Sequence, residues 1–176
     1  MTKHVVSVSL GSSTRDKSVL VELGGVEIRA ERRGVDGDLV AFNRLMRELD
    51  GYVDVLSVGG TEIAFHVDGE TLRFRSTDKL IDGVTKTPLV DGAGVKMTLE
   101  RRVFDLVSDD PAMDDAPRFE QAFLNIALDR WGMALAVGEV SDAVVYGDLM
   151  FSFGVPVALH SLGQVKKTAH MLVPIA

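Results

Sequence analysis

The run Val5-Val6-Ser7-Val8-Ser9-Leu10 sets the fold of the first part of the chain. Apolar Val6, Val8 and Leu10 alternate along it with polar Ser7 and Ser9. This period of two is typical of a β-strand that buries one of its faces. The sequence therefore predicts that the chain begins with a strand.

Two short turns, Gly24-Gly25 and Asp68-Gly69, predict β-hairpins. Each is flanked by alternating apolar residues, and both dipeptides tolerate the positive φ angles of tight hairpin turns. A further apolar run ends at Gly59-Gly60. The strands expected around these turns cover approximately residues 19–23, 26–30, 53–58, 63–67 and 72–74.

One helix is indicated by both its spacing and its ends. Apolar residues recur at helical spacing from Leu39 to Leu49, Asp38 precedes them as an N-cap, and Gly51 follows where a C-terminal glycine belongs. Similar but less complete patterns predict helices near residues 77–82, 96–107, 119–134 and 161–173.

The remaining patterns complete an α/β chain. We expect a buried strand at Pro88–Val90, an acidic loop from Ser108 to Pro117, and a strand at Ala143–Tyr146. This order favours a mixed sheet with N-terminal β-hairpins, followed by Rossmann-like β-loop-α units. It fits a single domain over residues 1–176 or two lobes, 1–87 and 88–176. Ribonuclease-H-like and actin-like domains begin in a similar way and are the alternative architecture.

Composition narrows the function classes. The 176 residues carry a net charge of −7, so phosphate backbones repel the chain and we expect no nucleic-acid partner. The absence of cysteine excludes disulfides and thiolate metal sites. We see no signal peptide and no apolar run of about 20 residues, so we expect a cytoplasmic protein without a membrane partner.

The first candidate site is the glycine-rich turn that follows Val90. Gly92 and Gly94 let backbone N–H groups approach an anion, while Asp91, Lys96 and Thr98 add polar side chains. The spacing is not that of a phosphate-binding P-loop, and Met97 replaces the third glycine of a dinucleotide fingerprint. A turn that connects a strand to a helix and binds nothing fits equally well.

Two other loops follow strands. The loop from Ser9 to Lys17 offers the hydroxyls of Ser12 and Ser13 to a ligand, although Ser9 stands where actin-like kinases place an aspartate. In Gly59-Gly60-Thr61-Glu62, the carboxylate of Glu62 could accept hydrogen bonds from a hydroxylated ligand. The alternatives are a solvent-facing hairpin loop and an exposed acidic turn.

Asp148 follows the predicted strand that ends at Tyr146. Burial beside apolar neighbours would raise its pKa, as a general base requires, and the alternative is a helix N-cap. No two of the four histidines have metal-ligand spacing, so we expect no metal site.

Several runs resemble a bacterial family often labelled quinate 5-dehydrogenase. They are residues 4–17 (HVVSVSLGSSTRDK), 90–96 (VDGAGVK), 98–102 (TLERR) and 146–151 (YGDLMF). The resemblance implies an oxidoreductase that acts on a polyhydroxy carboxylate with NAD or NADP. Such enzymes use a Lys–Asp pair, and the nearby pair here, Lys96 with Asp91, has a different order. Family members extend further, which implies that this chain corresponds to an N-terminal half.

Two functional hypotheses follow. The first is an enzyme that binds a nucleotide, phosphate or carboxylate at residues 91–98, with Lys96 and Asp148 as candidate catalytic residues. The second is a non-catalytic ligand-binding or assembly module. The second predicts a stable homo-oligomer. Half of a longer protein would also expose an apolar surface, so we expect either a homo-oligomer or a missing C-terminal half as partner.

Overall fold

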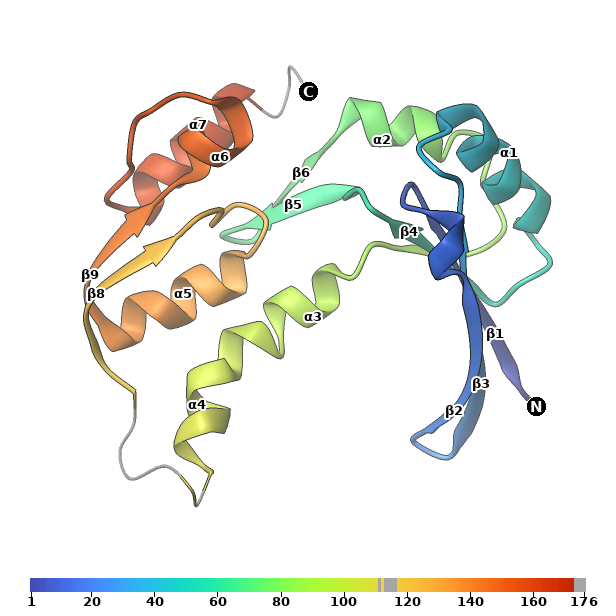
Figure 1. The fold of residues 1–176 in the computed structure, drawn as a ribbon, viewed down its shortest axis with the longest axis horizontal. Coiled ribbons are helices and arrows are strands. Elements are labelled where there is room, and N and C mark those ends of the chain that lie inside the picture. The colour runs from blue at the N-terminus through green and yellow to red at the C-terminus, as the bar shows by residue number, and fades with distance from the viewer. Residues whose placement is uncertain (111, 113–116, 173–176) are drawn as a thin grey trace. The chain divides into compact units, whose positions relative to one another are not determined.

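The computed structural model describes residues 1–110, 112 and 117–172 (Figure 1). It contains a mixed five-stranded sheet and several helices, which confirms the predicted α/β class. The chain divides into two compact units. Unit 1 comprises Met1–Ile63 and Arg73–Asp91, and unit 2 comprises Ala64–Leu72 and Gly92–Ala176.

The five-stranded sheet forms the centre of unit 1. Its strands are β1 (Lys3–Ser9), β2 (Lys17–Leu23), β3 (Val26–Gly34), β4 (Val55–Gly59) and β7 (Leu89–Val90), in the order β2-β3-β1-β4-β7. Strand β1 is parallel to both of its neighbours, β3 and β4, and β4 is parallel to β7. Only β2 is antiparallel, because it forms the predicted hairpin with β3 through Gly24-Gly25, where both φ angles are positive.

Helix α1 (Leu39–Leu49) builds the core of unit 1 on one face of this sheet. Phe42 and Met46 of α1 are fully buried against Val6 and Val8 of β1. The predicted ends of the helix are confirmed: Oδ1 of Asp38 accepts hydrogen bonds from two N–H groups of the first turn, both at 2.9 Å. The shorter helix α2 (Arg75–Leu80) begins two residues before the predicted one.

Two predicted strands of unit 1 are less buried than their patterns indicated. All seven residues of β2 are exposed, so its alternation does not mark a buried face. The strand predicted at Pro88–Val90 is observed as β7, but Val90 is 46% exposed. In both cases the cause is position: β2 and β7 are the two edge strands of the sheet.

Unit 2 contains a β-α-β motif. Strand β8 pairs in parallel with β9, and α5 connects them and packs against both strands (Figure 1). The other elements are short. In chain order, the elements beyond β4 that belong wholly or largely to unit 2 are β5 (Ala64–Val67), β6 (Glu70–Arg73), α3 (Ala93–Met97), the 3₁₀ helix η2 (Glu100–Arg102), α4 (Val103–Ser108), β8 (Phe119–Leu124), α5 (Trp131–Val140), β9 (Ser141–Tyr146), α6 (Asp148–Phe153) and α7 (Leu162–Leu172).

Two predicted helices of unit 2 are wrong in part. The first half of the helix predicted over residues 119–134 is strand β8, and a helix begins only at Trp131. The helix predicted over residues 96–107 begins at Ala93 and is interrupted after Met97. At this break the Thr98 hydroxyl donates to the carbonyl of Gly94 at 2.6 Å, and a Cβ atom on Gly132 would overlap the Lys96 carbonyl.

The second predicted hairpin, β5–β6, is also observed and packs on α7. Asp68 and Gly69 have the expected positive φ angles. Lys166 of α7 binds the carboxylates of Asp68 and Glu70, each at 2.8 Å. Helix α7 begins beside Ser161 as predicted. Val173, its predicted end, and most of the predicted loop from Ser108 to Pro117 lie outside the described residues.

No helix in the described part of the chain is both long and apolar enough to cross a membrane.

Asp50 provides a test of the fold of unit 1. This buried carboxylate follows α1 and accepts the N–H groups of Thr85, Lys86 and Thr87, at 2.9, 3.0 and 2.7 Å. These bonds, the one from Thr85 first, lower the pKa of Asp50 from 3.8 to about 2. Since the folded state holds the charged form, its contribution to stability is complete above the unfolded pKa of 3.8 and is lost as the pH falls towards about 2.

We therefore expect Asp50→Asn to lower the melting temperature by several degrees at neutral pH. The difference from the wild type should shrink between pH 3.8 and about 2, where the wild-type carboxylate becomes protonated. Thermal unfolding followed by circular dichroism across this range measures the effect. Asp82→Asn is the control, because that exposed carboxylate lies 3.9 Å from Arg47 and should matter little. A difference that does not change with pH would contradict this account.

Candidate functional site

The parallel strands of unit 1 place four loops at one edge of the sheet. Strands β1, β3, β4 and β7 end there, at Ser9, Gly34, Gly59 and Val90. From β1 the chain continues to β2 and β3 on one side, and from β4 it continues to β7 on the other. The connections that leave the neighbouring strands β1 and β4 therefore run in opposite directions along the sheet. Open α/β sheets bind ligands at such a point. The edge beside β1 and β4 is therefore the candidate site.

The loop after β1 is held closely to this edge. The N–H of Leu10 donates to the Gly59 carbonyl at 2.9 Å, and the N–H of Gly37 donates to the Leu10 carbonyl at 2.8 Å. Residues Ser13–Arg15 form a short 3₁₀ helix, η1, in which the Ser12 hydroxyl accepts the N–H of Thr14. The loop thus has a defined conformation within unit 1.

Two guanidinium groups lie against Gly11 in this loop. A Cβ atom on Gly11 would overlap the Arg15 guanidinium and would lie 3.0 Å from Nη2 of Arg32. Arg32 is mostly buried and donates to the Ser9 hydroxyl, the Ser12 carbonyl and the Asp16 carboxylate, at 3.0, 2.9 and 2.9 Å. Arg15 is exposed, and within the described part of the chain it has no carboxylate partner.

Carboxylates accompany these cations. Asp36, after β3, accepts the N–H of Ser13 at 2.8 Å, and hydrogen bonds from Ser13 lower the pKa of Asp36. Asp91, after β7, accepts the N–H of Ile63 at 2.9 Å. The edge therefore presents both signs of charge together with hydroxyl groups.

Glycines allow the strands to approach at this edge. A Cβ atom on Gly34 would lie 2.6 Å from the carbonyl oxygens of Gly11 and Ser12, and one on Gly59 would lie 2.9 Å from Cβ of Ser9. Only a residue without a side chain fits at contacts this short.

The candidate residues 91–98 are divided between the two units. Asp91 belongs to unit 1, whereas Gly92, Gly94, Lys96 and Thr98 belong to unit 2. Lys96 forms an ion pair with Asp129, and the Thr98 hydroxyl donates to Gly94. Helix α3, which follows the turn, has only five residues. An anion site at this turn stays a prediction, and its two polar side chains already have partners.

Asp148 is fully buried in unit 2. Its two carboxylate oxygens accept the N–H groups of Ala127 and Leu128, at 3.1 and 2.8 Å. Burial raises the pKa of Asp148, as expected, while the two N–H groups act in the opposite direction. It anchors the turn before α5, and its role as a general base stays a prediction.

Other charged residues form pairs on the surface. Arg29 and Arg33 bind the Glu31 carboxylate, at 2.8 and 2.9 Å, and Arg101 binds Glu139. These pairs offset much of the positive charge at residues 29–33 and part of that at residues 100–102. Among residues 1–110, 112 and 117–172 no group of three His, Asp or Glu side chains could hold a metal ion.

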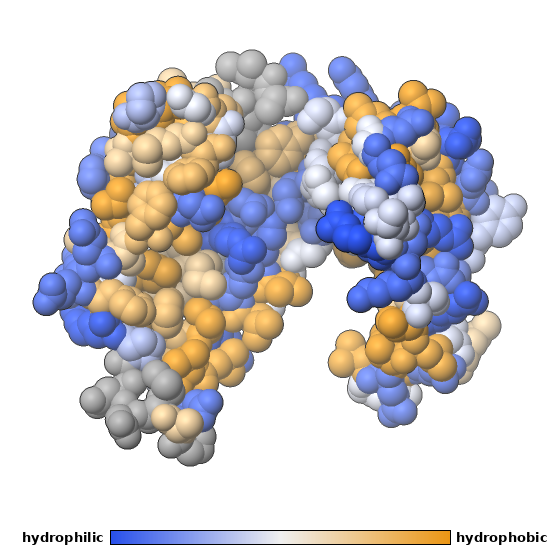
Figure 2. All heavy atoms as spheres, in the orientation of Figure 1, coloured by the Kyte–Doolittle hydropathy of each residue, from blue (hydrophilic) through white to orange (hydrophobic). Residues whose placement is uncertain are grey.

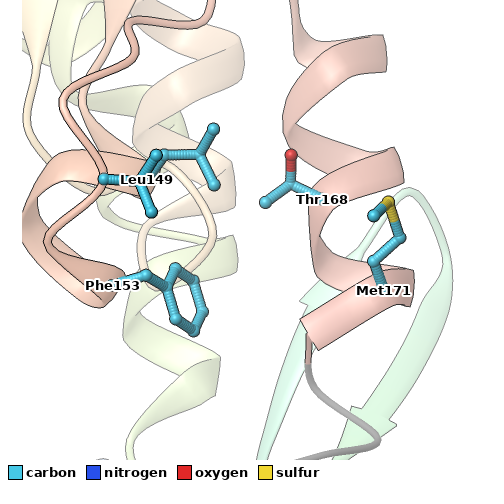
Figure 3. Close-up of a pocket in the computed structure, with 5 residues that line it drawn as sticks. Leu149, Phe153, Thr168 and Met171 are labelled. Atoms are coloured by element: carbon cyan, nitrogen blue, oxygen red, sulfur yellow. The ribbon is translucent and has the colours of Figure 1, made fainter.

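Unit 2 contains a small apolar pocket of about 210 Å³ between α6 and α7 (Figure 3). Leu149 and Phe153 of α6 face Thr168 and Met171 of α7, and Val155 completes the lining. The lining holds one hydroxyl and no charge, so this pocket can take only an apolar group.

Sequence reasoning identified three of the loops at the edge of unit 1 but missed its arginines. Ser12 and Ser13, Gly59-Gly60 and Asp91 are all at this edge. Arg15 is part of the run from Ser9 to Lys17, yet no local pattern distinguishes it from a solvated charge. Arg32 lies in the run Arg29-Ala30-Glu31-Arg32-Arg33, where alternating charges resemble a solvated strand face, and only its pairing across the sheet shows its partners.

Two family models match the chain. The first, described as "Domain of unknown function (DUF8753)", matches residues 4–91, which is half of the chain, and the second, "Domain of unknown function (DUF8754)", matches residues 94–176. Their common boundary coincides with the passage from unit 1 to unit 2 after Asp91, although the first model also includes the β5–β6 hairpin of unit 2. No curated protein and no solved structure matches the chain.

The close approach at Gly34 can be tested by substitution. We expect Gly34→Ala to destabilise the chain by about 1–3 kcal/mol, because the added methyl group must displace the backbone of the loop after β1. Urea unfolding measures the change. Gly94→Ala is the matched control: a Cβ atom there meets open space, and alanine suits its position within α3. Equal effects of the two substitutions would contradict the tight packing at Gly34.

Proposed function

We propose that this chain, which belongs to the family described as "Domain of unknown function (DUF8753)", binds a small hydroxylated carboxylate at the carboxyl edge of the sheet in unit 1. The observation that carries this proposal is the Arg15 guanidinium, which lies against Gly11 at the reversal between β1 and β4 and has no carboxylate partner among the described residues. A guanidinium suits a carboxylate because it donates two parallel hydrogen bonds.

The charges around Arg15 favour a small ligand with a single negative group. Arg32 is already paired with Asp16, and Asp36 adds a further carboxylate beside Ser13. A polyphosphate would be repelled by these acids, whereas hydroxyl groups could donate to them. The Ser12 and Ser13 side chains provide further hydroxyls at the loop.

The resemblance to quinate 5-dehydrogenases agrees with this ligand class, since quinate is a polyhydroxy carboxylate. Oxidation of a polyhydroxy carboxylate with NAD or NADP is a separate proposal that rests on the resemblance alone, and its candidate catalytic residues, Lys96 and Asp148, belong to unit 2. Formation of reduced nicotinamide with quinate or shikimate would test it. The binding proposal does not depend on that outcome, because its residues all belong to unit 1.

We expect quinate or shikimate to raise the melting temperature of the chain, since a ligand that binds only the folded state stabilises it. Arg15→Gln should lower the affinity for this ligand by at least about tenfold, because a hydrogen bond to a charged group contributes roughly 1.5–3 kcal/mol. Thermal-shift titrations with each ligand, and with phosphate and ATP for comparison, measure the affinities.

Two control variants locate the site. Arg44→Gln changes an arginine on α1 whose nearest acid is 3.9 Å away, and should leave binding unchanged. Lys96→Gln, compared with its own unliganded melting temperature, should also leave binding unchanged. Loss of binding in Lys96→Gln but not in Arg15→Gln would reject the site in unit 1 in favour of the turn at residues 91–98.

A further inference from the structure

Strand β2 is an edge strand whose side chains are all exposed. It is the first strand in the sheet order, seven residues long, and contains no proline. Leu20 is 62% exposed and Leu23 is 72% exposed. A long, apolar edge strand offers unpaired backbone groups to another strand, and proteins usually protect such edges.

The β2–β3 hairpin also carries an apolar face. Its register sets Val19 opposite Ala30, Val21 opposite Ile28 and Leu23 opposite Val26, so all six side chains share one face. Hydrophobic residues gather over this hairpin in Figure 2. Helix α1 covers the other face of the sheet, because Val6 of β1 is in register with Glu31 and not with Ala30.

Hairpin geometry determines which backbone groups of β2 face the open edge. Leu23 and Val26 close the two-residue turn and form a hydrogen-bonded pair. Alternate residues of β2 therefore bond to β3, and the N–H and C=O groups of Ser18, Leu20 and Glu22 point away from β3. These three residues form the free edge.

We propose that two copies of the chain pair through β2, antiparallel, about a two-fold axis at Leu20. In this register Leu20 faces its own copy and Ser18 faces Glu22, so every free N–H and C=O group of the edge acquires a partner. Val19 faces Val21 of the other copy in the closely spaced, non-hydrogen-bonded position, where side chains contact best. The Ser18 hydroxyl can donate to the Glu22 carboxylate.

Charge distinguishes this register from its neighbours. A shift of two residues in one direction would set Asp16 opposite Glu22 of the other copy, two like charges. A shift in the other direction would set Leu20 opposite Glu22 and Lys17 opposite the Gly24-Gly25 turn. The register centred on Leu20 alone avoids both mismatches and uses the whole strand.

A second copy fits this edge better than an unrelated strand because β2 is complementary to itself. The sequence Val19-Leu20-Val21 is symmetric about its centre, and a two-fold axis repeats the same contacts on both sides. Pairing also makes the two apolar hairpin faces continuous.

Leu20→Glu tests the pairing without disturbing the hairpin. Within one chain the new carboxylate lies opposite Arg29, which is favourable, whereas across the axis it faces an identical carboxylate. Sedimentation velocity should give twice the 19.1 kDa chain mass for the wild type and a single chain mass for Leu20→Glu. Val40→Glu, the same change on the exposed surface of α1, should remain a dimer.

A cysteine variant provides a second measurement. The chain contains no cysteine, so Leu20→Cys has one thiol, placed opposite its own copy at a Cα separation of about 5.5 Å that a disulfide can span. Mild oxidation should yield a covalent dimer from Leu20→Cys but not from Val40→Cys. A monomeric wild type, a dimer that persists in Leu20→Glu, or equal cross-linking of the two cysteine variants would overturn the proposal.

Discussion

The parallel pairing of β1 with β3 on one side and β4 on the other determines the rest of unit 1. Because the strands run in the same direction, Ser9, Gly34 and Gly59 must lie in one row at one edge of the sheet. The two glycines let that row close to distances at which a side chain on Gly34 would collide with the loop after β1 and one on Gly59 would collide with Ser9 of β1 itself. The position of Arg15 at the edge follows from this packing.

Features that depend on neighbouring residues could be predicted from the sequence. Both hairpin turns have residues that accept positive φ, and α1 has a capping aspartate and an apolar stripe, so each is determined within a few residues. Burial was harder to predict, because alternation along β2 is the same whether a strand is central or at an edge. Its exposure follows from the sheet order, which no local pattern gives.

Features that depend on distant partners could not be predicted. Phe119 and Phe123 are four residues apart, as on a helix face, but β8 forms because it pairs with β9, about twenty residues later. The site is similar: Arg15 comes from the loop after β1, whereas Arg32 and Asp36 lie at and just after the end of β3, and pairing of β1 with β3 brings the two segments together. The sequence identified the loops, since serines and glycines after strands are local signals, but not the cation that completes them.

The loop with Arg15 leads directly into β2, yet the two surfaces are structurally separable. Asp16, the last residue before β2, binds both the Arg32 guanidinium and the N–H of Gly34, so contacts within one chain fix the loop. The backbone groups offered for pairing belong instead to Ser18, Leu20 and Glu22, which make no contribution to that anchoring. Binding of a ligand at the carboxyl edge of the sheet therefore does not require a second copy of the chain. Pairing of two copies through the edge strand β2, in turn, does not require a ligand.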